Sequence, residues 1–307
     1  MTRGDSSAAT DKIITVGSGV DLAATLTLPA GRGPHAAIVP LHPASERSRD
    51  QMLFRHLAEV LPSRGIAVLR YDRRGDDVPF EDQVADANSA IDVLRARSDI
   101  NRSRIGLWGF SQGAWIGPMV AAESDRVAFL VLLASTGVSP AEQMRYGTVK
   151  HARLAGYGDD VARRIVELRG ALEGFQRGRL PRDQAQRAID AAANEPWFEH
   201  AYVRRELPDK PGFWPDMDFD PAAVFARVRV PTLLFYGEDD EWQPIDASIA
   251  AWKRAAVAAG NDQLTIVRLT GTGHAPTRGG RDERDAIAPE YERSLVAWLD
   301  DRVGSRR

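Results

Sequence analysis

The sequence contains no cysteine among its 307 residues. This absence excludes disulfides, thiolate nucleophiles, and zinc or iron–sulfur sites with Cys ligands. The sequence also lacks a basic tract, because 40 Lys and Arg stand against 43 Asp and Glu, a formal charge of −3. A nucleic acid or an anionic membrane surface is therefore not expected as a partner.

Long apolar runs are absent as well. No stretch is apolar enough for a membrane span, and the polar N-terminal sequence MTRGDSSAATDK has no signal-peptide core. We therefore expect a soluble, cytoplasmic protein. Hydrophobic residues make up 43% of the chain, which is enough for a substantial core.

Short apolar runs alternate with amphipathic stretches along most of the chain. A hairpin is expected first, followed by buried strands with helices between them. The expected strands are residues 12–16, 21–29, 35–41, 65–72, 104–110, 127–135, 230–237 and 263–269. This alternation predicts an α/β fold with a doubly wound, mostly parallel sheet.

The alternation stops between residues 138 and 222. Four helices without strands are expected there, at 140–155, 158–177, 181–194 and 196–206. We therefore predict a helical cap over residues 138–222, inserted into a core formed by 1–137 and 223–307.

Ser111 stands between two glycines in GFSQG, directly after the strand at 104–110 and before an expected helix. A strand-to-helix turn holds a serine in a strained backbone conformation and needs small residues such as Gly109 and Gly113 on either side. The turn lies at the carboxyl edge of the sheet and directs the Gln112 N–H towards a developing oxyanion. Ser111 is therefore a candidate nucleophile.

A serine nucleophile needs a base and an acid that orients the base. His274 follows the last strand in a glycine-rich loop, at the same edge as Ser111. The preceding strand is followed by four adjacent carboxylates, Glu238 to Glu241. All four cannot be buried without a large cost, so one is expected to turn inward towards His274.

Four segments resemble the α/β-hydrolases, of the serine esterase/peptidase-like type with a helical cap. They are RYDRRG, DINRSRIGLWGFSQGA, VPTLLFYGEDDEWQP and GTGHAPT, and they follow one another in the family's order. The family's G-x-x-D-x-x-x-P pattern implies that Asp240 is the acid, with Pro244 closing the loop, and leaves Asp239 as the alternative. The resemblance implies no cofactor, and no pair of histidines has the spacing of metal ligands.

The loop expected to supply the second oxyanion donor differs in sequence from the family's pattern. Relatives often carry His-Gly before the donor, whereas this chain reads LHPAS. Pro43 has no N–H, so Ala44 is the expected donor and His42 is expected to shape the loop.

In YDRRG, the charges of Asp72, Arg73 and Arg74 indicate a turn paired within itself, with recognition of a substrate carboxylate as the alternative.

The expected activity is hydrolysis of a small to medium, partly apolar carboxylic ester through an acyl-enzyme. Peptide or amide cleavage, acyl transfer and a non-catalytic ligand receptor are the alternatives. The expected partner is a small-molecule substrate, and the sequence leaves a homodimer open. Candidate substrate-contacting residues are Tyr146, Trp197 and Trp214 of the cap and Trp108 of the strand before Ser111.

Overall fold

A single eight-stranded sheet forms the centre of the molecule in the computed structural model, which describes residues 9–76, 78–281 and 283–303. The strand order is β1-β2-β4-β3-β5-β6-β7-β8, and β3 to β8 pair in parallel. Only β1 and β2 pair antiparallel with their neighbours in this sheet, among the residues described. The doubly wound, mostly parallel α/β sheet is thereby confirmed. The strands are β1 (Thr10–Val16), β2 (Leu22–Leu28), β3 (His35–Leu41), β4 (Ile66–Tyr71), β5 (Ile100–Phe110), β6 (Leu130–Leu133), β7 (Thr232–Gly237) and β8 (Leu264–Leu269).

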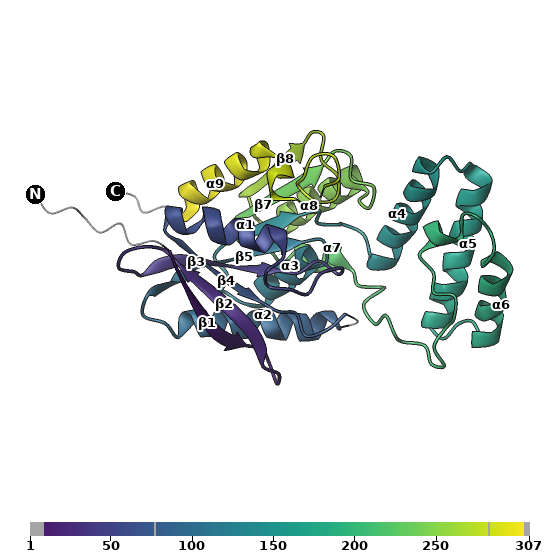
Figure 1. The fold of residues 1–307 in the computed structure, drawn as a ribbon, viewed down its shortest axis with the longest axis horizontal. Coiled ribbons are helices and arrows are strands. Elements are labelled where there is room, and N and C mark those ends of the chain that lie inside the picture. Colours follow the sequence, from purple (N-terminus) through teal and green to yellow (C-terminus); the bar gives the residue numbers. More distant parts are fainter. Residues whose placement is uncertain (1–8, 77, 282, 304–307) are drawn as a thin grey trace, which may run out of the picture.

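Helices cover both faces of this sheet (Figure 1). On one face, α1 and α9 bury Phe54, Tyr291 and Trp298 against the strands. On the other face, α2, α3, α7 and α8 contribute a second apolar cluster that includes Trp115 and Trp252. The helices are α1 (Met52–Val60), α2 (Phe80–Arg95), α3 (Gly113–Glu123), α7 (Pro221–Phe225), α8 (Ile245–Ala259) and α9 (Pro289–Val303), with 3-10 turns η1 (Pro62–Arg64) and η3 (Arg284–Ala286). In the described ranges, every helix is too short or too polar to cross a lipid bilayer.

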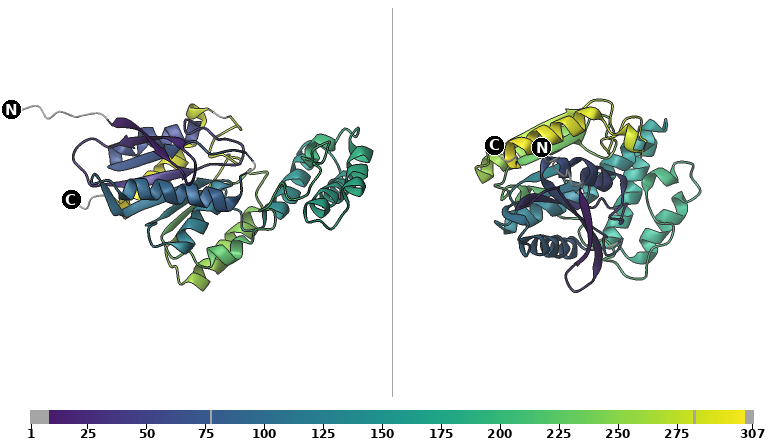
Figure 2. Two further views of the ribbon diagram at one scale, coloured as in Figure 1. Left: turned by 90° about the horizontal axis from the view of Figure 1, so that it is seen from below. Right: turned by 60° about the vertical axis from the view of Figure 1, so that its left-hand side comes forward.

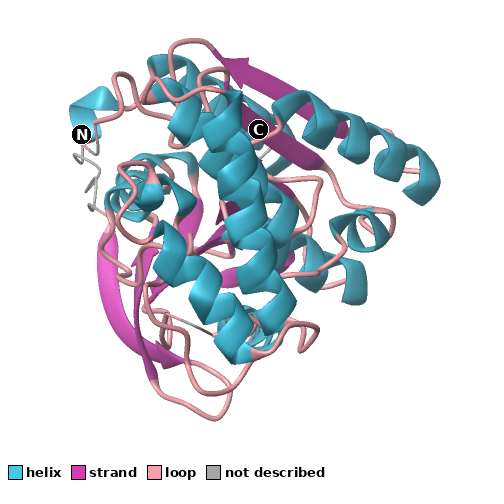
Figure 3. Cartoon of the chain, turned by 90° about the vertical axis from the view of Figure 1, so that its right-hand side faces the viewer, coloured by secondary structure: helices cyan, strands magenta, loops and turns pink. Residues whose placement is uncertain are grey.

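A separate helical unit stands beyond one end of the sheet (Figures 1 and 2). Its helices follow β6 in the chain and bury an apolar cluster of their own. In Figure 3, which looks from the side of this unit, its helices lie in front of the sheet. We call it the cap: α4 (Pro140–Leu154), α5 (Asp159–Gln176), α6 (Arg182–Ala192) and the 3-10 turn η2 (Phe198–Ala201).

Local sequence explains where the cap helices begin and end. A capping box between Ser139 and Glu142 starts α4, with Pro140 in its first turn. The helix expected over 196–206 is instead the short turn η2, because Tyr202 takes a left-handed conformation with φ of 49° and ends it.

The short helix α7, which the sequence pattern did not predict, packs between α3 and α8 of the core.

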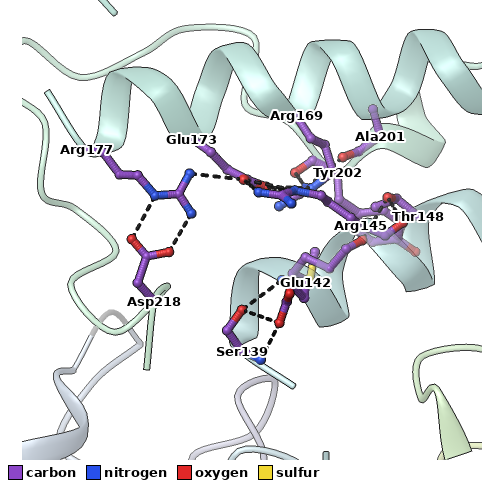
Figure 4. A network of polar contacts seen from close by, with 11 residues as sticks. Ser139, Glu142, Arg145, Thr148, Arg169, Glu173, Arg177, Ala201, Tyr202 and Asp218 are labelled. Carbon is purple, nitrogen blue, oxygen red and sulfur yellow. Dashed lines mark hydrogen bonds and ion pairs between the residues drawn. The ribbon is translucent and has the colours of Figure 1, made fainter. Parts of the chain in front are cut away.

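A buried carboxylate joins the cap helices to the segment that returns to the core (Figure 4). Glu173 of α5 is fully buried and accepts hydrogen bonds from Arg145 of α4 and from Arg177. Arg177 Nε also donates to Asp218 of the returning segment, at 2.7 Å. Arg169 is buried beside Glu173, and burial lowers its pKa to about 10, so it is still a cation at neutral pH. Glu173, with Asp218 at its edge, therefore compensates a cluster of three arginines.

Replacing Glu173 with Gln should destabilise the cap by about 3 kcal/mol, because it leaves buried arginine charge without its counter-ion. We expect a lower urea midpoint and faster protease cleavage within residues 178–220. Glu195→Gln is the matched control, since Glu195 pairs with Arg164 at the surface of the same unit. Equal stability losses in the two variants would contradict a structural role for the buried carboxylate.

Candidate active site

Ser111 occupies the sharp turn between β5 and α3. Its φ is 53°, in the left-handed region that costs about 1–2 kcal/mol for a residue with a side chain. The flanking glycines permit the turn, because a Cβ on Gly109 would lie 2.3 Å from the Gly113 carbonyl oxygen, and one on Gly113 would lie 2.3 Å from the Leu41 oxygen. The backbone strain predicted for this turn is therefore present, and the turn places the serine at the carboxyl edge of the sheet.

The Ser111 hydroxyl is the first member of a chain of hydrogen bonds. Its Oγ lies 2.9 Å from His274 Nε2. The other ring nitrogen, Nδ1, lies 2.9 Å from Asp240 Oδ2. His274 follows β8 and Asp240 follows β7, so three loops at one edge of the sheet bring together three side chains that are far apart in sequence. The arrangement can take a proton from Ser111 and stabilise the resulting imidazolium.

Of the four adjacent carboxylates from Glu238 to Glu241, only Asp240 is buried. Its side chain is 0% exposed, whereas Glu238 and Asp239 are exposed and Glu241 is half-buried. The Trp242 backbone N–H donates to Asp240 Oδ1 at 2.8 Å, which supports the buried charge. The structure thus brings Asp240 to His274 as the sequence pattern implied.

A cavity of about 490 Å³ opens at the Ser111 hydroxyl. Core loops form one side of it, and α4 with the loop after η2 forms the other. None of the described residues that line it is Asp, Glu, Lys or Arg, and seven are aromatic or Met. The lining residues are Pro43, Ala44, Ser45, Phe80, Phe110, Ser111, Gln112, Trp115, Pro140, Gln143, Met144, Tyr202, Trp214, Trp242 and His274.

Of the four candidate substrate-contacting residues, only Trp214 lines this cavity in the described structure. The prediction that Trp108 contacts substrate is wrong. Trp108 is fully buried on the α1 and α9 face of the sheet, where its Nε1 donates to the Tyr291 hydroxyl at 2.9 Å. The same prediction for Trp197 is wrong as well, because Trp197 is buried within the apolar cluster of the cap. Tyr146 is partly exposed on α4 and lies outside the lining.

Several lining residues were not anticipated, and Trp242 is the most informative of them. Its ring packs against the cap, because a Cβ on Gly147 of α4 would lie 2.3 Å from it. His151 of α4 and Tyr202 surround the same ring, with centroids 4.4 and 5.0 Å away. The available signal was position, since Trp242 lies in the same loop as Asp240, two residues after it. Trp242 therefore packs against the cap, lines the cavity and donates a hydrogen bond to Asp240.

The segments expected to hold an oxyanion both border the cavity. Gln112 precedes α3, and Ala44 lies in the loop after β3. His42 is buried between Phe54 and Tyr71, and burial with the nearby Arg73 charge lowers its pKa to about 3. A neutral His42 packed among aromatic rings fits the expectation that it shapes the loop.

The charged turn after β4 is paired within the protein. Asp72 bonds to Arg49, and Arg74 bonds to Asp86. Arg73 is buried and donates to backbone carbonyls. The charges of the turn are therefore paired, as expected, although Asp72 and Arg74 find their partners outside the turn. None of these described arginines lines the cavity, so the alternative of substrate carboxylate recognition gains no support. In the part of the chain that the structure describes, no three His, Asp or Glu side chains converge as a metal site requires.

Sequence comparison links the chain to characterised proteins. The model of the alpha/beta hydrolase family matches residues 40–290. Esterase EstD of Thermotoga maritima is 27% identical over 282 residues, which are 86% of this chain and 61% of EstD. The chain therefore spans less than two thirds of the length of that relative.

Solved structures share the fold over almost the whole chain. An esterase of Pyrococcus furiosus superposes with a TM-score of 0.63 at 15% identity, covering 96% of this chain and 92% of the esterase. An acylaminoacyl peptidase of Pyrococcus horikoshii gives a TM-score of 0.62 at 13% identity, covering 98% of this chain and 43% of the peptidase. At these identities the similarity concerns the fold alone.

Proposed function

The chain belongs to the alpha/beta hydrolase family, and from this premise we propose that it is a serine hydrolase that cleaves carboxylic esters with Ser111, His274 and Asp240. The observation that carries the proposal is the continuous hydrogen bonding from Ser111 Oγ through both ring nitrogens of His274 to a buried carboxylate. The similarity to esterase EstD supports an ester as the substrate.

The proposed reaction proceeds through an acyl-enzyme. Ser111 Oγ attacks the ester carbonyl carbon while His274 Nε2 takes the hydroxyl proton. The tetrahedral intermediate collapses, the C–O bond to the leaving group breaks, and His274 returns the proton to the departing oxygen. Water then attacks the acyl-enzyme with His274 again as base, which releases the acid and restores Ser111. Asp240 holds the imidazole with its proton on Nδ1 throughout.

The negative oxygen of each intermediate requires preorganised donors. In this proposal the backbone N–H of Gln112 is one donor and the N–H of Ala44 is the other. Gln112 stands at the N-terminus of α3, where the helix dipole favours negative charge. Pro43 has no N–H to offer.

The cavity supports a neutral, partly apolar substrate. Its volume of about 490 Å³ suits a small to medium ligand. Aromatic side chains and Met144 can pack against acyl or alkyl groups, whereas a substrate carboxylate would find no Lys or Arg among the described lining residues. An unpaired buried charge costs several kcal/mol.

The test is a matched pair of activated esters, mono-p-nitrophenyl glutarate and its neutral methyl ester. We expect kcat/KM for the neutral ester to be higher by about 100-fold, which corresponds to about 3 kcal/mol. The two substrates share the same leaving group and the same reacting carbonyl, so the ratio reports the environment of the acyl chain. Release of p-nitrophenol above the enzyme-free rate measures both reactions, because the carboxylate of the glutarate monoester also expels p-nitrophenol on its own by forming the cyclic anhydride.

Two outcomes would contradict the proposal. Equal or faster hydrolysis of the anionic ester would contradict the neutral substrate class. No turnover of either ester, or of a wider set of alkyl and aryl esters, together with cleavage of an amide or peptide, would contradict ester hydrolysis itself.

A further inference from the structure

Arg73 lies directly after β4 and is buried beside the two segments that carry the proposed oxyanion donors. Its side chain is only 2% exposed. The guanidinium donates to the carbonyl oxygens of Pro43 and Ala44, both at 2.9 Å, and to Gln112 Oε1 at 3.0 Å. Its Nε donates to the Gly75 carbonyl at 2.7 Å. One side chain thus connects the loop after β3, the start of α3 and its own turn.

These bonds determine which way the loop amides point. In a trans peptide the C=O and the following N–H point in opposite directions. Because the Pro43 and Ala44 carbonyls point at Arg73, the N–H groups of Ala44 and Ser45 point away from it. Pro43, Ala44 and Ser45 line the cavity. Within the described part of the chain, neither amide donates a hydrogen bond to another protein group, so both are available for an oxyanion.

We propose that Arg73 is a positioning residue that holds the loop at 43–45 and Gln112 in the arrangement that receives the oxyanion; this inference rests on the proposed function. Arg73 does not line the cavity and acts through the groups that it holds. A guanidinium suits this task because its rigid fork can donate to several acceptors at once, whereas the ammonium of Lys is a single point of charge on a flexible chain.

The inference also accounts for the unusual LHPAS sequence. A proline in this loop removes one N–H and fixes one φ, but it does not orient the peptides that follow. The two bonds from Arg73 to consecutive carbonyls supply that orientation. Donor placement matters because misplacing a reacting or stabilising group by about 1 Å can cost roughly 100-fold in rate.

The test compares Arg73→Gln and Arg73→Lys with Arg74→Gln. Arg74 is the matched control, because it is the neighbouring arginine of the same turn but bonds to Asp86 and the Ser18 carbonyl instead. Two quantities are measured beside kcat and KM. They are the affinity for a trifluoromethyl ketone, which forms a tetrahedral oxyanion on Ser111, and the affinity for a methyl ketone of the same shape as a ground-state ligand.

Arg73→Gln should lower kcat by about 30-fold or more with KM changed less than about threefold, and should weaken the trifluoromethyl ketone by a similar factor. The methyl ketone should bind nearly as before. Arg73→Lys should fall between Arg73→Gln and the wild type, and it serves as the test variant if Arg73→Gln does not fold. Arg74→Gln should lower the melting temperature without changing kcat by more than about threefold.

The inference is overturned if the Arg73 variants keep the kcat and trifluoromethyl ketone affinity of the wild type. It is also overturned if their losses match those of Arg74→Gln and follow the melting temperature. A wild-type protein that neither hydrolyses esters nor binds the trifluoromethyl ketone would instead defeat the proposed function. The two failures are therefore distinguishable.

Discussion

Ser111→Ala is expected to lower ester hydrolysis by about 10⁴-fold or more, because no covalent acyl-enzyme can form without the Oγ atom. His274 Nε2 loses the hydroxyl from which it would take a proton. Substrate binding should change little, since the apolar lining of the cavity stays in place. The measurements are kcat with a p-nitrophenyl ester and labelling by a fluorophosphonate probe, which should modify the wild type and leave Ser111→Ala unlabelled.

Ser111→Gly is the control for the strained backbone at this position. It should be as inactive as Ser111→Ala but more stable by about 1 kcal/mol, because glycine adopts a φ of 53° without the Cβ penalty. Strain that is relieved only when the nucleophile is removed indicates a conformation kept for function. Residual labelling or turnover in both variants would show that a different residue is the nucleophile.

The order of strands and helices was predictable because burial imposes a repeating pattern on the sequence. Strands of a parallel sheet covered on both faces read as short, continuous apolar runs, and the intervening helices show 3.6-residue periodicity. The strand boundaries agree with the expected ones to within a few residues. The proximity of Ser111, Asp240 and His274 was predictable for the same reason, because loops after neighbouring parallel strands meet at one edge.

The lining of the cavity was much less predictable. A buried strand is apolar on both faces, so its sequence does not reveal which face a given aromatic residue occupies. Trp108 lies one residue before Gly109 and points into the core beneath α1 and α9. Trp197 illustrates the same difficulty in the cap, where an aromatic residue can fill the unit's own core or face the cavity.

Contacts between distant segments were also hidden from the sequence. Trp242 follows a run of carboxylates, which indicates an exposed loop, yet its ring packs against Gly147 and His151 of α4. Arg73 reads as one charge in a charged turn, and its carbonyl partners carry no sequence signature because every residue has a carbonyl. Such roles depend on the path of the backbone in three dimensions.

Asp240→Asn should lower kcat by about 10⁴-fold at neutral pH by reversing the tautomer of His274. The Trp242 N–H donates to Oδ1, and His274 Nδ1 lies nearer to Oδ2. An asparagine would keep its oxygen on the Trp242 N–H and turn its NH₂ towards Nδ1. Nδ1 would then have to accept, so the ring proton would move to Nε2, which could no longer take the proton of Ser111.

Asp239→Asn is the matched control, because Asp239 is the exposed neighbour of Asp240 and the same substitution there leaves the site unchanged. Kinetics of both variants should be joined by nitrogen NMR of ¹⁵N-histidine protein, in which Asp240→Asn shifts the ring signals of one histidine to the other tautomer. Retention of activity within about tenfold in Asp240→Asn, or a comparable loss in Asp239→Asn, would mean that another carboxylate orients the base. The burial of Asp240 and its bond to Trp242 argue against that outcome, since among these four carboxylates only Asp240 is both buried and in contact with the His274 ring.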